Sequence, residues 1–151
     1  MSIDERLTEL GIVIPEATPP VANYASARRS GNVVYISGHI GKRDGSVVTG
    51  KVGDTIDTET AYAVARQTAI DILGSARALL GSLDDVAVVR ITGYVSSAPG
   101  FNNQPAVVNG ASDLVTEVFG PERGRHARSA IGVAELPLGA AVEIEAILEI
   151  V

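Results

Sequence analysis

Three arginines and a row of alternating glutamates are the residues of this chain best suited to chemistry. The arginines fall within the segment Arg123 to Arg128, and the glutamates follow at Glu143 and Glu145. Arginine presents a planar fork of donors that binds a carboxylate in a bidentate way. Glutamate offers an acceptor that can hold or polarise a water molecule. A site that binds a small carboxylic acid and adds water to it needs both kinds of group.

Each of these groups also has a plain structural interpretation. Glutamates at alternate positions of a strand are often solvated charges, and surface arginines often form ion pairs. Arg128 differs from Arg123 and Arg125 because it begins an expected strand and lies close to the glutamate row. Its position makes it the best of the three arginines for a role in ligand binding.

Other catalytic patterns are missing from the sequence. The only histidines are His39 and His126, and there is no cysteine, whereas zinc sites need three or four ligands at recognisable spacing. No G-x-G-x-x-G, G-x-x-x-x-G-K-[ST] or G-x-S-x-G pattern occurs. The sequence therefore gives no support for a metal site, a nucleotide site or a serine hydrolase.

The overall composition limits the partners that the chain can have. Its 151 residues fit one domain, and hydrophobic residues make up 46% while aromatic residues make up only 4%, so the core must be aliphatic. The net charge of −6 argues against a nucleic-acid partner and against an anionic membrane surface. The N-terminus lacks the basic and apolar runs of a signal peptide, so we expect a soluble cytoplasmic protein.

Hydrophobic periodicity predicts alternating strands and helices. Residues 58–80 have apolar side chains at three- and four-residue spacing before Gly81, which indicates a helix. A second helix is expected from Pro105 to Gly120-Pro121, and a short one over residues 3–10 behind a capping box at Ser2. Strands are expected over residues 32–40, 86–96, about 128–134 and 141–150, with an Asp-Gly turn at residues 43–46.

Two such helices can cover only one face of a mixed sheet. The uncovered face is expected to include a set of largely apolar residues, namely Val33, Tyr35, Val88, Ala130 and Ala134. A small domain with an apolar second sheet face usually buries that face in an oligomer.

Alternation along the strands assigns the candidate residues to faces. Glu143 and Glu145 share the face of the last strand that is turned away from the helices, because the apolar residues between them must face the helices. Arg128 and Ala130 share a face of a strand that we expect to lie next to the one with Glu143. In the first strand, one face is expected to carry Val33, Tyr35, Ser37 and His39.

From about residue 18 to the C-terminus, the chain resembles the Rid/YjgF family of reactive-intermediate deaminases, also labelled endoribonuclease L-PSP or translation-inhibitor proteins. Each matching motif is weak alone, but together and in family order they are specific. The R-H-A-R-S form of residues 125–129 resembles a divergent subgroup. The matching segments are Pro20-Val21-Ala22-Asn23-Tyr24, Tyr35-Ile36-Ser37-Gly38-His39-Ile40, Gly93-Tyr94-Val95, Val107-Val108-Asn109, Ala127-Arg128-Ser129, Leu136-Pro137 and Val142-Glu143-Ile144-Glu145-Ala146.

The resemblance implies a single domain over residues 1–151, with residues 1–17 as an N-terminal extension. It implies a chorismate-mutase-like α+β fold, in which two helices pack on one face of a mixed β-sheet and three chains assemble as a homotrimer. The sites would lie in clefts between subunits. Members of the family hydrolyse enamines and imines such as 2-aminoacrylate, or related 2-imino acids, to a 2-oxo acid and ammonia without a cofactor.

Carried over by motif, the resemblance also implies roles for individual residues. Arg128 would bind the substrate carboxylate, and Glu143 would position or activate the water. The substrate pocket would be lined by Tyr24, Ser37, Gly38, Asn109 and Ala130.

The chain departs from the family pattern at four positions. Ala130 stands where cysteine is frequent, His39 follows Ser-Gly in place of glutamine, Gly132 replaces a frequent glutamate, and His126 replaces an apolar residue. The anion-binding Arg128 is retained, but the four changes leave the identity of the natural substrate open. A hydrolytic deaminase is the favoured interpretation, and a non-catalytic carboxylate binder or regulator on the same scaffold is the alternative. The acidic composition counts against a ribonuclease.

Overall fold

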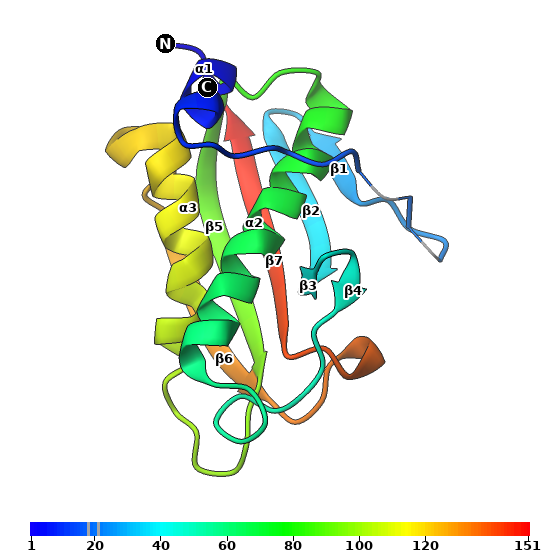
Figure 1. The fold of residues 1–151 in the computed structure, drawn as a ribbon. Coiled ribbons are helices and arrows are strands. Elements are labelled where there is room, and N and C mark those ends of the chain that lie inside the picture. The colour runs from blue at the N-terminus through cyan, green and yellow to red at the C-terminus, as the bar shows by residue number, and fades with distance from the viewer. Residues whose placement is uncertain (18, 21) are drawn as a thin grey trace.

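The computed structural model describes residues 1–17, 19–20 and 22–151, and its centre is a five-stranded sheet. The strand order is β1-β2-β7-β5-β6, with β5 and β6 parallel and the other neighbours antiparallel (Figure 1). A separate two-stranded sheet joins β3 and β4. The strands are β1 Ala27–Ser30, β2 Val33–Ile40, β3 Lys42–Arg43, β4 Ser46–Val47, β5 Val86–Ser96, β6 Ala127–Val133 and β7 Val142–Ile150.

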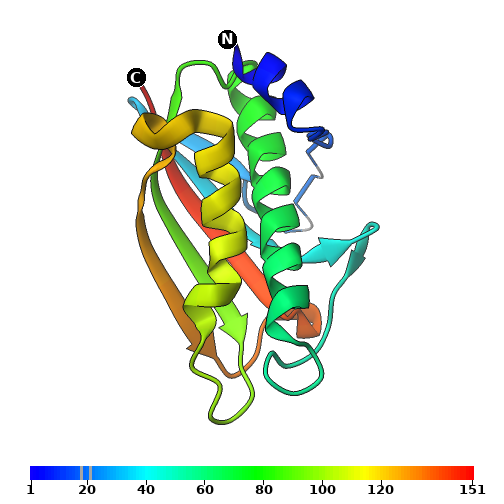
Figure 2. The ribbon, with the colours of Figure 1, turned by 60° about the vertical axis from the view of Figure 1, so that its left-hand side comes forward.

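Two long helices pack side by side on one face of this sheet (Figure 2). The first, α2, spans Thr58–Leu80; the Asp57 side chain caps its N-terminus and Gly81 ends it, as expected. The second, α3, spans Gln104–Gly124, with Pro105 in its first turn. Gly120 leaves the helical conformation, but a last turn continues through Pro121 to Gly124, so the expected end at Gly120-Pro121 is a kink.

The two helices approach closely at Gly110. A Cβ built on Gly110 would overlap the backbone oxygen of Tyr62 on α2. A glycine inside a helix is costly, so either helix packing or an approaching ligand must require Gly110. The close contact with α2 shows that helix packing requires a glycine at this position.

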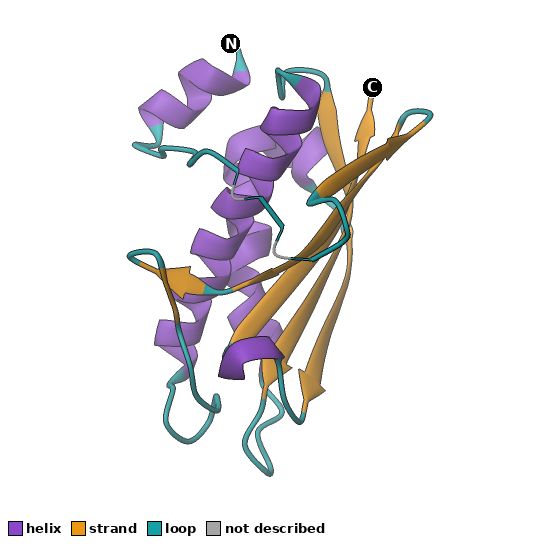
Figure 3. Ribbon diagram, turned by 90° about the vertical axis from the view of Figure 1, so that its right-hand side faces the viewer, coloured by secondary structure: helices purple, strands orange, loops and turns teal. Residues whose placement is uncertain are grey.

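A third helix, α1 (Ile3–Glu9), lies against the end of the helix layer. The expected capping box is present, because Ser2 and Glu5 each bond the other's backbone N–H. Ile3 and Leu7 are buried in the same hydrophobic core as the sheet and the long helices. The side view of Figure 3 shows the long helices on one side of the sheet, and no helix of the described residues covers the other side. We call that other side the open face.

Two irregularities in register change the faces that simple alternation predicts. Between Ile36 and His39 the pairing of β2 with β7 shifts, so that His39 lies opposite Ile144 and Ile40 lies opposite Glu143. His39 therefore faces the helices, and its expected place beside Val33 and Tyr35 is wrong. A second shift, after Val88 in β5, keeps Val88 in the helix-side core, so it is not part of the open face.

Candidate active site

Glu143 lies on the open face of β7, directly over Gly38 of β2. A Cβ built on Gly38 would overlap Oε1 of Glu143, so glycine is the residue that leaves room for this carboxylate. The bulge between Ile36 and His39 brings Gly38 to that position. The expected turn of Glu143 away from the helices is confirmed, since its chain neighbours Val142 and Ile144 are buried in the core beneath the helices.

The surroundings of Glu143 favour its protonated form. Burial raises its pKa above the ordinary carboxyl value, and the nearby charge of Glu145 raises the pKa further. Tyr94, on β5, donates a hydrogen bond of 3.1 Å to Oε1 of Glu145. The pKa of Tyr94 is itself raised, first by burial and then by this hydrogen bond. A carboxylate with a raised pKa accepts a proton more readily near neutral pH than an ordinary glutamate does.

Ser37 precedes Gly38 on β2 and is hydrogen-bonded to the segment before β1. The Ser37 hydroxyl donates to the Ala25 carbonyl at 2.6 Å, and the Ser37 N–H donates to the Ser26 carbonyl at 2.9 Å. The Ser37 hydroxyl proton is thus in use, and its oxygen can only accept from a ligand. Tyr24, next to Ala25 in the chain, is 52% exposed. We call Tyr24, Ser37, Gly38 and Glu143 the glutamate half-site.

Arg128 lies at the opposite edge of the sheet, on β6. Its Nη1 donates to Oδ1 of Asn109 at 2.7 Å and to the hydroxyl of Ser112 at 3.2 Å, both on α3. These contacts of the described residues use one nitrogen, so the edge formed by Nε and Nη2 suits a carboxylate. Ala130 follows two residues later on the same face and packs against the core. We call Arg128, Asn109 and Ala130 the arginine half-site.

The two half-sites do not meet within one chain, and the expectation that the strand of Arg128 lies next to the strand of Glu143 is wrong. Arg128 is the register partner of Ile91, which is buried on the helix side, whereas Glu143 is the partner of Tyr94 on the open face. The strand β5 also separates β6 from β7. The same register places Ala130 beside Gly93, whose added Cβ would overlap Val108 of α3, so Ala130 does not belong to the open face either.

The structure adds polar residues that the sequence did not single out. On the open face, Arg90 donates to the Ser129 hydroxyl at 2.6 Å. Near Arg128, the hydroxyl of Ser112 lies 2.9 Å from Nε2 of His126. Alternation along residues 90–94 could have placed Arg90 and Tyr94 on one face, but no sequence pattern places Ser112 beside His126.

Two further properties of the described residues bear on the kind of site. No group of three or more His, Asp or Glu side chains in residues 1–17, 19–20 and 22–151 is arranged to hold a metal ion. No helix in that part of the chain combines the length and the apolar character needed to cross a bilayer.

The chain is similar to several known proteins. It is 45% identical to protein TCP17 of Trypanosoma cruzi, a match that covers 95% of this chain and 91% of that one. It is 35% identical to a 2-iminobutanoate/2-iminopropanoate deaminase of Dermatophagoides farinae, over 92% of this chain and 94% of the other. A solved structure from Agrobacterium tumefaciens, described as of unknown function, superposes with a TM-score of 0.89 at 44% identity, covering 99% of this chain and 92% of that one.

A family model agrees with these similarities. The model described as endoribonuclease L-PSP matches residues 15–150, from the approach to β1 to the end of β7. The match takes in both half-sites and leaves α1 outside. The chain therefore belongs to the endoribonuclease L-PSP family, also called the Rid/YjgF family.

Proposed function

We propose that this protein hydrolyses reactive enamines and imines derived from amino acids, such as 2-aminoacrylate, to 2-oxo acids and ammonia. The observation that carries the proposal is the carboxylate of Glu143, half-buried over Gly38 with a raised pKa. The Nε and Nη2 edge of Arg128, which its contacts with Asn109 and Ser112 do not use, adds a partner for the substrate carboxylate. The relative named as a 2-iminobutanoate/2-iminopropanoate deaminase gives independent support for the same reaction class.

The chemistry assigns one step to each half-site. Arg128 binds the substrate carboxylate and places the imine carbon toward the glutamate. An enamine such as 2-aminoacrylate first gains a proton at C3 and loses one from nitrogen, which converts it to the imine. Glu143 then takes a proton from a water molecule as the water oxygen bonds to the imine carbon, and passes that proton to the imine nitrogen. The carbinolamine so formed loses ammonia as its C–N bond breaks, and the hydroxyl becomes the oxo group. One water is consumed and no electrons are exchanged, so the reaction balances without a redox partner.

A second copy of the chain would complete the site. Because Arg128 and Glu143 lie on opposite faces, one small substrate can reach both only if they come from different subunits. A contact between the β6 edge of one copy and the open face of the next is heterologous, and three such contacts close a ring. Large side chains on the open face support an interface, since Tyr35 is 50% exposed and Ile131 is 43% exposed.

The experiment that tests the proposal measures turnover and binding separately. An amino acid dehydratase generates 2-aminoacrylate from serine in the presence of semicarbazide, and the protein competes with semicarbazide for the imine. We expect the rate of semicarbazone formation to fall as the protein concentration rises. Calorimetric titration with pyruvate reports the carboxylate site alone. Pyruvate binding without any change in the trapping rate would overturn the deaminase and leave the carboxylate binder.

A further inference from the structure

The two histidines of the chain make the same pair of contacts. Nδ1 of His126 lies 2.7 Å from the carbonyl oxygen of Gly124, two residues earlier, and Nε2 lies 2.9 Å from the Ser112 hydroxyl. His39 repeats the pattern, with Nδ1 at 2.6 Å from the Ser37 carbonyl and Nε2 at 2.8 Å from the hydroxyl of Ser75 on α2. Of the two serines, Ser112 is the one that also contacts a residue of the proposed site, Arg128.

The direction of the hydrogen bonds around His126 follows from the chemistry of the groups. A carbonyl oxygen only accepts, so Nδ1 carries the hydrogen and Nε2 of the neutral ring is an acceptor. The Ser112 hydroxyl then donates to Nε2 and presents its lone pairs elsewhere. Arg128 only donates, and its Nη1 meets the Ser112 oxygen. The contacts form one directed chain from Arg128 through Ser112 and His126 to the Gly124 carbonyl.

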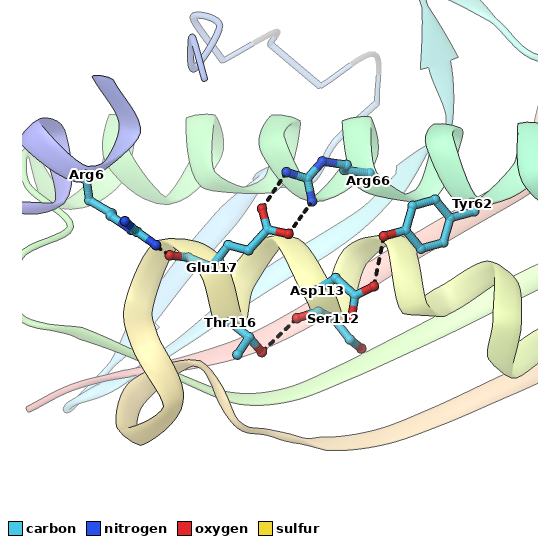
Figure 4. Close-up of polar contacts among 7 residues, drawn as sticks. All are labelled: Arg6, Tyr62, Arg66, Ser112, Asp113, Thr116 and Glu117. Atoms are coloured by element: carbon cyan, nitrogen blue, oxygen red, sulfur yellow. Dashed lines mark hydrogen bonds and ion pairs between the residues drawn. The ribbon is translucent and has the colours of Figure 1, made fainter. Parts of the chain in front are cut away.

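Neighbouring residues show what the Ser112 hydroxyl would do without this partner. A serine or threonine inside a helix commonly turns its hydroxyl back to the carbonyl four residues earlier. One turn further along α3, Thr116 does so, donating to the Ser112 carbonyl at 2.9 Å. Figure 4 shows Ser112 and Thr116 together on one side of α3, while Asp113 and Glu117 reach toward α2 on another. His126 thus competes with the helix backbone for the Ser112 proton.

We infer that His126 is a positioning residue for Arg128, acting through Ser112. By holding the Ser112 hydroxyl in one rotamer, it keeps a lone pair aimed at Nη1 and fixes the plane of the guanidinium. Asn109 holds the same nitrogen at 2.7 Å, so the two acceptors together orient the other edge of the fork. The inference deepens the proposed function, because a fixed guanidinium plane matters most when Arg128 binds a carboxylate in a bidentate way.

A matched pair of substitutions at His126 separates the loss of its hydrogen bond to Ser112 from the loss of its side-chain volume. Glutamine places an amide group where the imidazole has Nε2, so H126Q can still accept from Ser112. Asparagine is shorter and leaves that place empty, so H126N removes the acceptor. We expect H126N and Ser112→Ala each to weaken pyruvate binding roughly three- to tenfold, as for a lost hydrogen bond. H126Q should recover most of the affinity, and Thr116→Val, on the same helix, should leave it unchanged.

Kinetic measurements and a double variant add two further tests to the pyruvate-binding experiment. H126N should raise KM with kcat nearly kept, because the arginine serves ground state and transition state alike. The combined H126N and S112A variant should bind pyruvate no more weakly than either single variant, since both break one chain. Additive losses, or an equal loss in H126Q and H126N, would overturn the inference. Thermal melts of all variants identify any loss that comes from misfolding.

A second arm needs no substrate, so it separates this inference from the proposed function. Nitrogen NMR of the wild-type ring should show the Nδ1–H tautomer of His126, and an Nε2–H tautomer would overturn the directed chain. The rate at which phenylglyoxal modifies Arg128, followed by peptide mass spectrometry, should rise in H126N and S112A but not in H126Q or T116V. If the wild type neither binds pyruvate nor deaminates, the proposed function fails, while these two readouts still decide the role of His126.

Discussion

The carboxylate of Glu143 occupies the space that a side chain on Gly38 would fill, across the β2–β7 pair. The colliding atom is the far end of a flexible side chain, so Gly38→Ala should fold and displace the carboxylate. We expect kcat for imine hydrolysis to fall at least tenfold while pyruvate affinity changes little, because the arginine half-site is untouched. Steady-state kinetics and calorimetry on the same preparation check this. Unchanged kcat in a folded variant would show that the position of Glu143 is not critical.

Gly110→Ala is the counterpart of Gly38→Ala, but here the atoms that the new Cβ would overlap belong to the backbone of a helix and cannot move aside. A Cβ built there meets the backbone oxygen of Tyr62 and the backbone nitrogen of Arg66, so α2 and α3 must separate. We expect G110A to lose about 1–3 kcal/mol of unfolding free energy, as overpacking usually costs. Urea denaturation measures the loss. A variant as stable as the wild type would mean that the helices have room to separate.

The arginine half-site predicts that charge alone is not enough at position 128. Arg128→Lys keeps the positive charge but loses the planar fork and the paired geometry toward Asn109. We expect a strong rise in the dissociation constant for pyruvate, with the melting temperature little changed. Calorimetry measures the dissociation constant for pyruvate, and thermal melting measures the stability of the same variant. A lysine variant with wild-type affinity would remove Arg128 from substrate binding.

Glu143→Gln tests the water-activating role. Glutamine is nearly isosteric but cannot accept a proton, so kcat should fall about 10²- to 10⁴-fold with pyruvate affinity kept. In the wild type, kcat should fall as pH drops through the raised pKa of Glu143, above the ordinary value of 4.5. Turnover of E143Q at the wild-type rate would leave Glu143 as a structural charge.

The same group predicts a pH effect on stability with a definite sign. Because its pKa is raised in the folded protein, the folded state holds the Glu143 proton more tightly than the unfolded chain does. The contribution of Glu143 to the unfolding free energy is therefore greatest at low pH and falls as pH rises from 4.5 through the raised pKa. The E143Q variant should lack this fall. Urea denaturation of both proteins across that range makes the comparison.

The sequence predicted the elements better than their arrangement. The helix at residues 58–80 and the strand at 86–96 were confirmed because each carries a long, regular pattern with clear ends. His39 and Val88 were assigned to the wrong face because a β-bulge adds one residue and reverses alternation beyond it. The strand of Arg128 was expected next to the strand of Glu143, which was wrong because strand order depends on tertiary packing, and β5 lies between them. The short edge strand β1 carries no apolar alternation and was not predicted.

Mixing two inactive variants tests whether the site spans two subunits. Arg128→Ala keeps the glutamate half-site, and E143Q keeps the arginine half-site. Each half-site is intact in half of the chains. In trimers assembled at random from equal amounts, about one quarter of the sites between neighbours therefore have both half-sites intact. After unfolding and refolding the mixture together, we expect deaminase activity near that fraction of the wild type, and light scattering should give the mass of three chains.

Each variant refolded alone supplies the background activity. The two variants mixed without unfolding are the control for trimers that do not exchange subunits. A refolded mixture no more active than its components, at trimer mass, would place the whole reaction within one chain and contradict the two-subunit site.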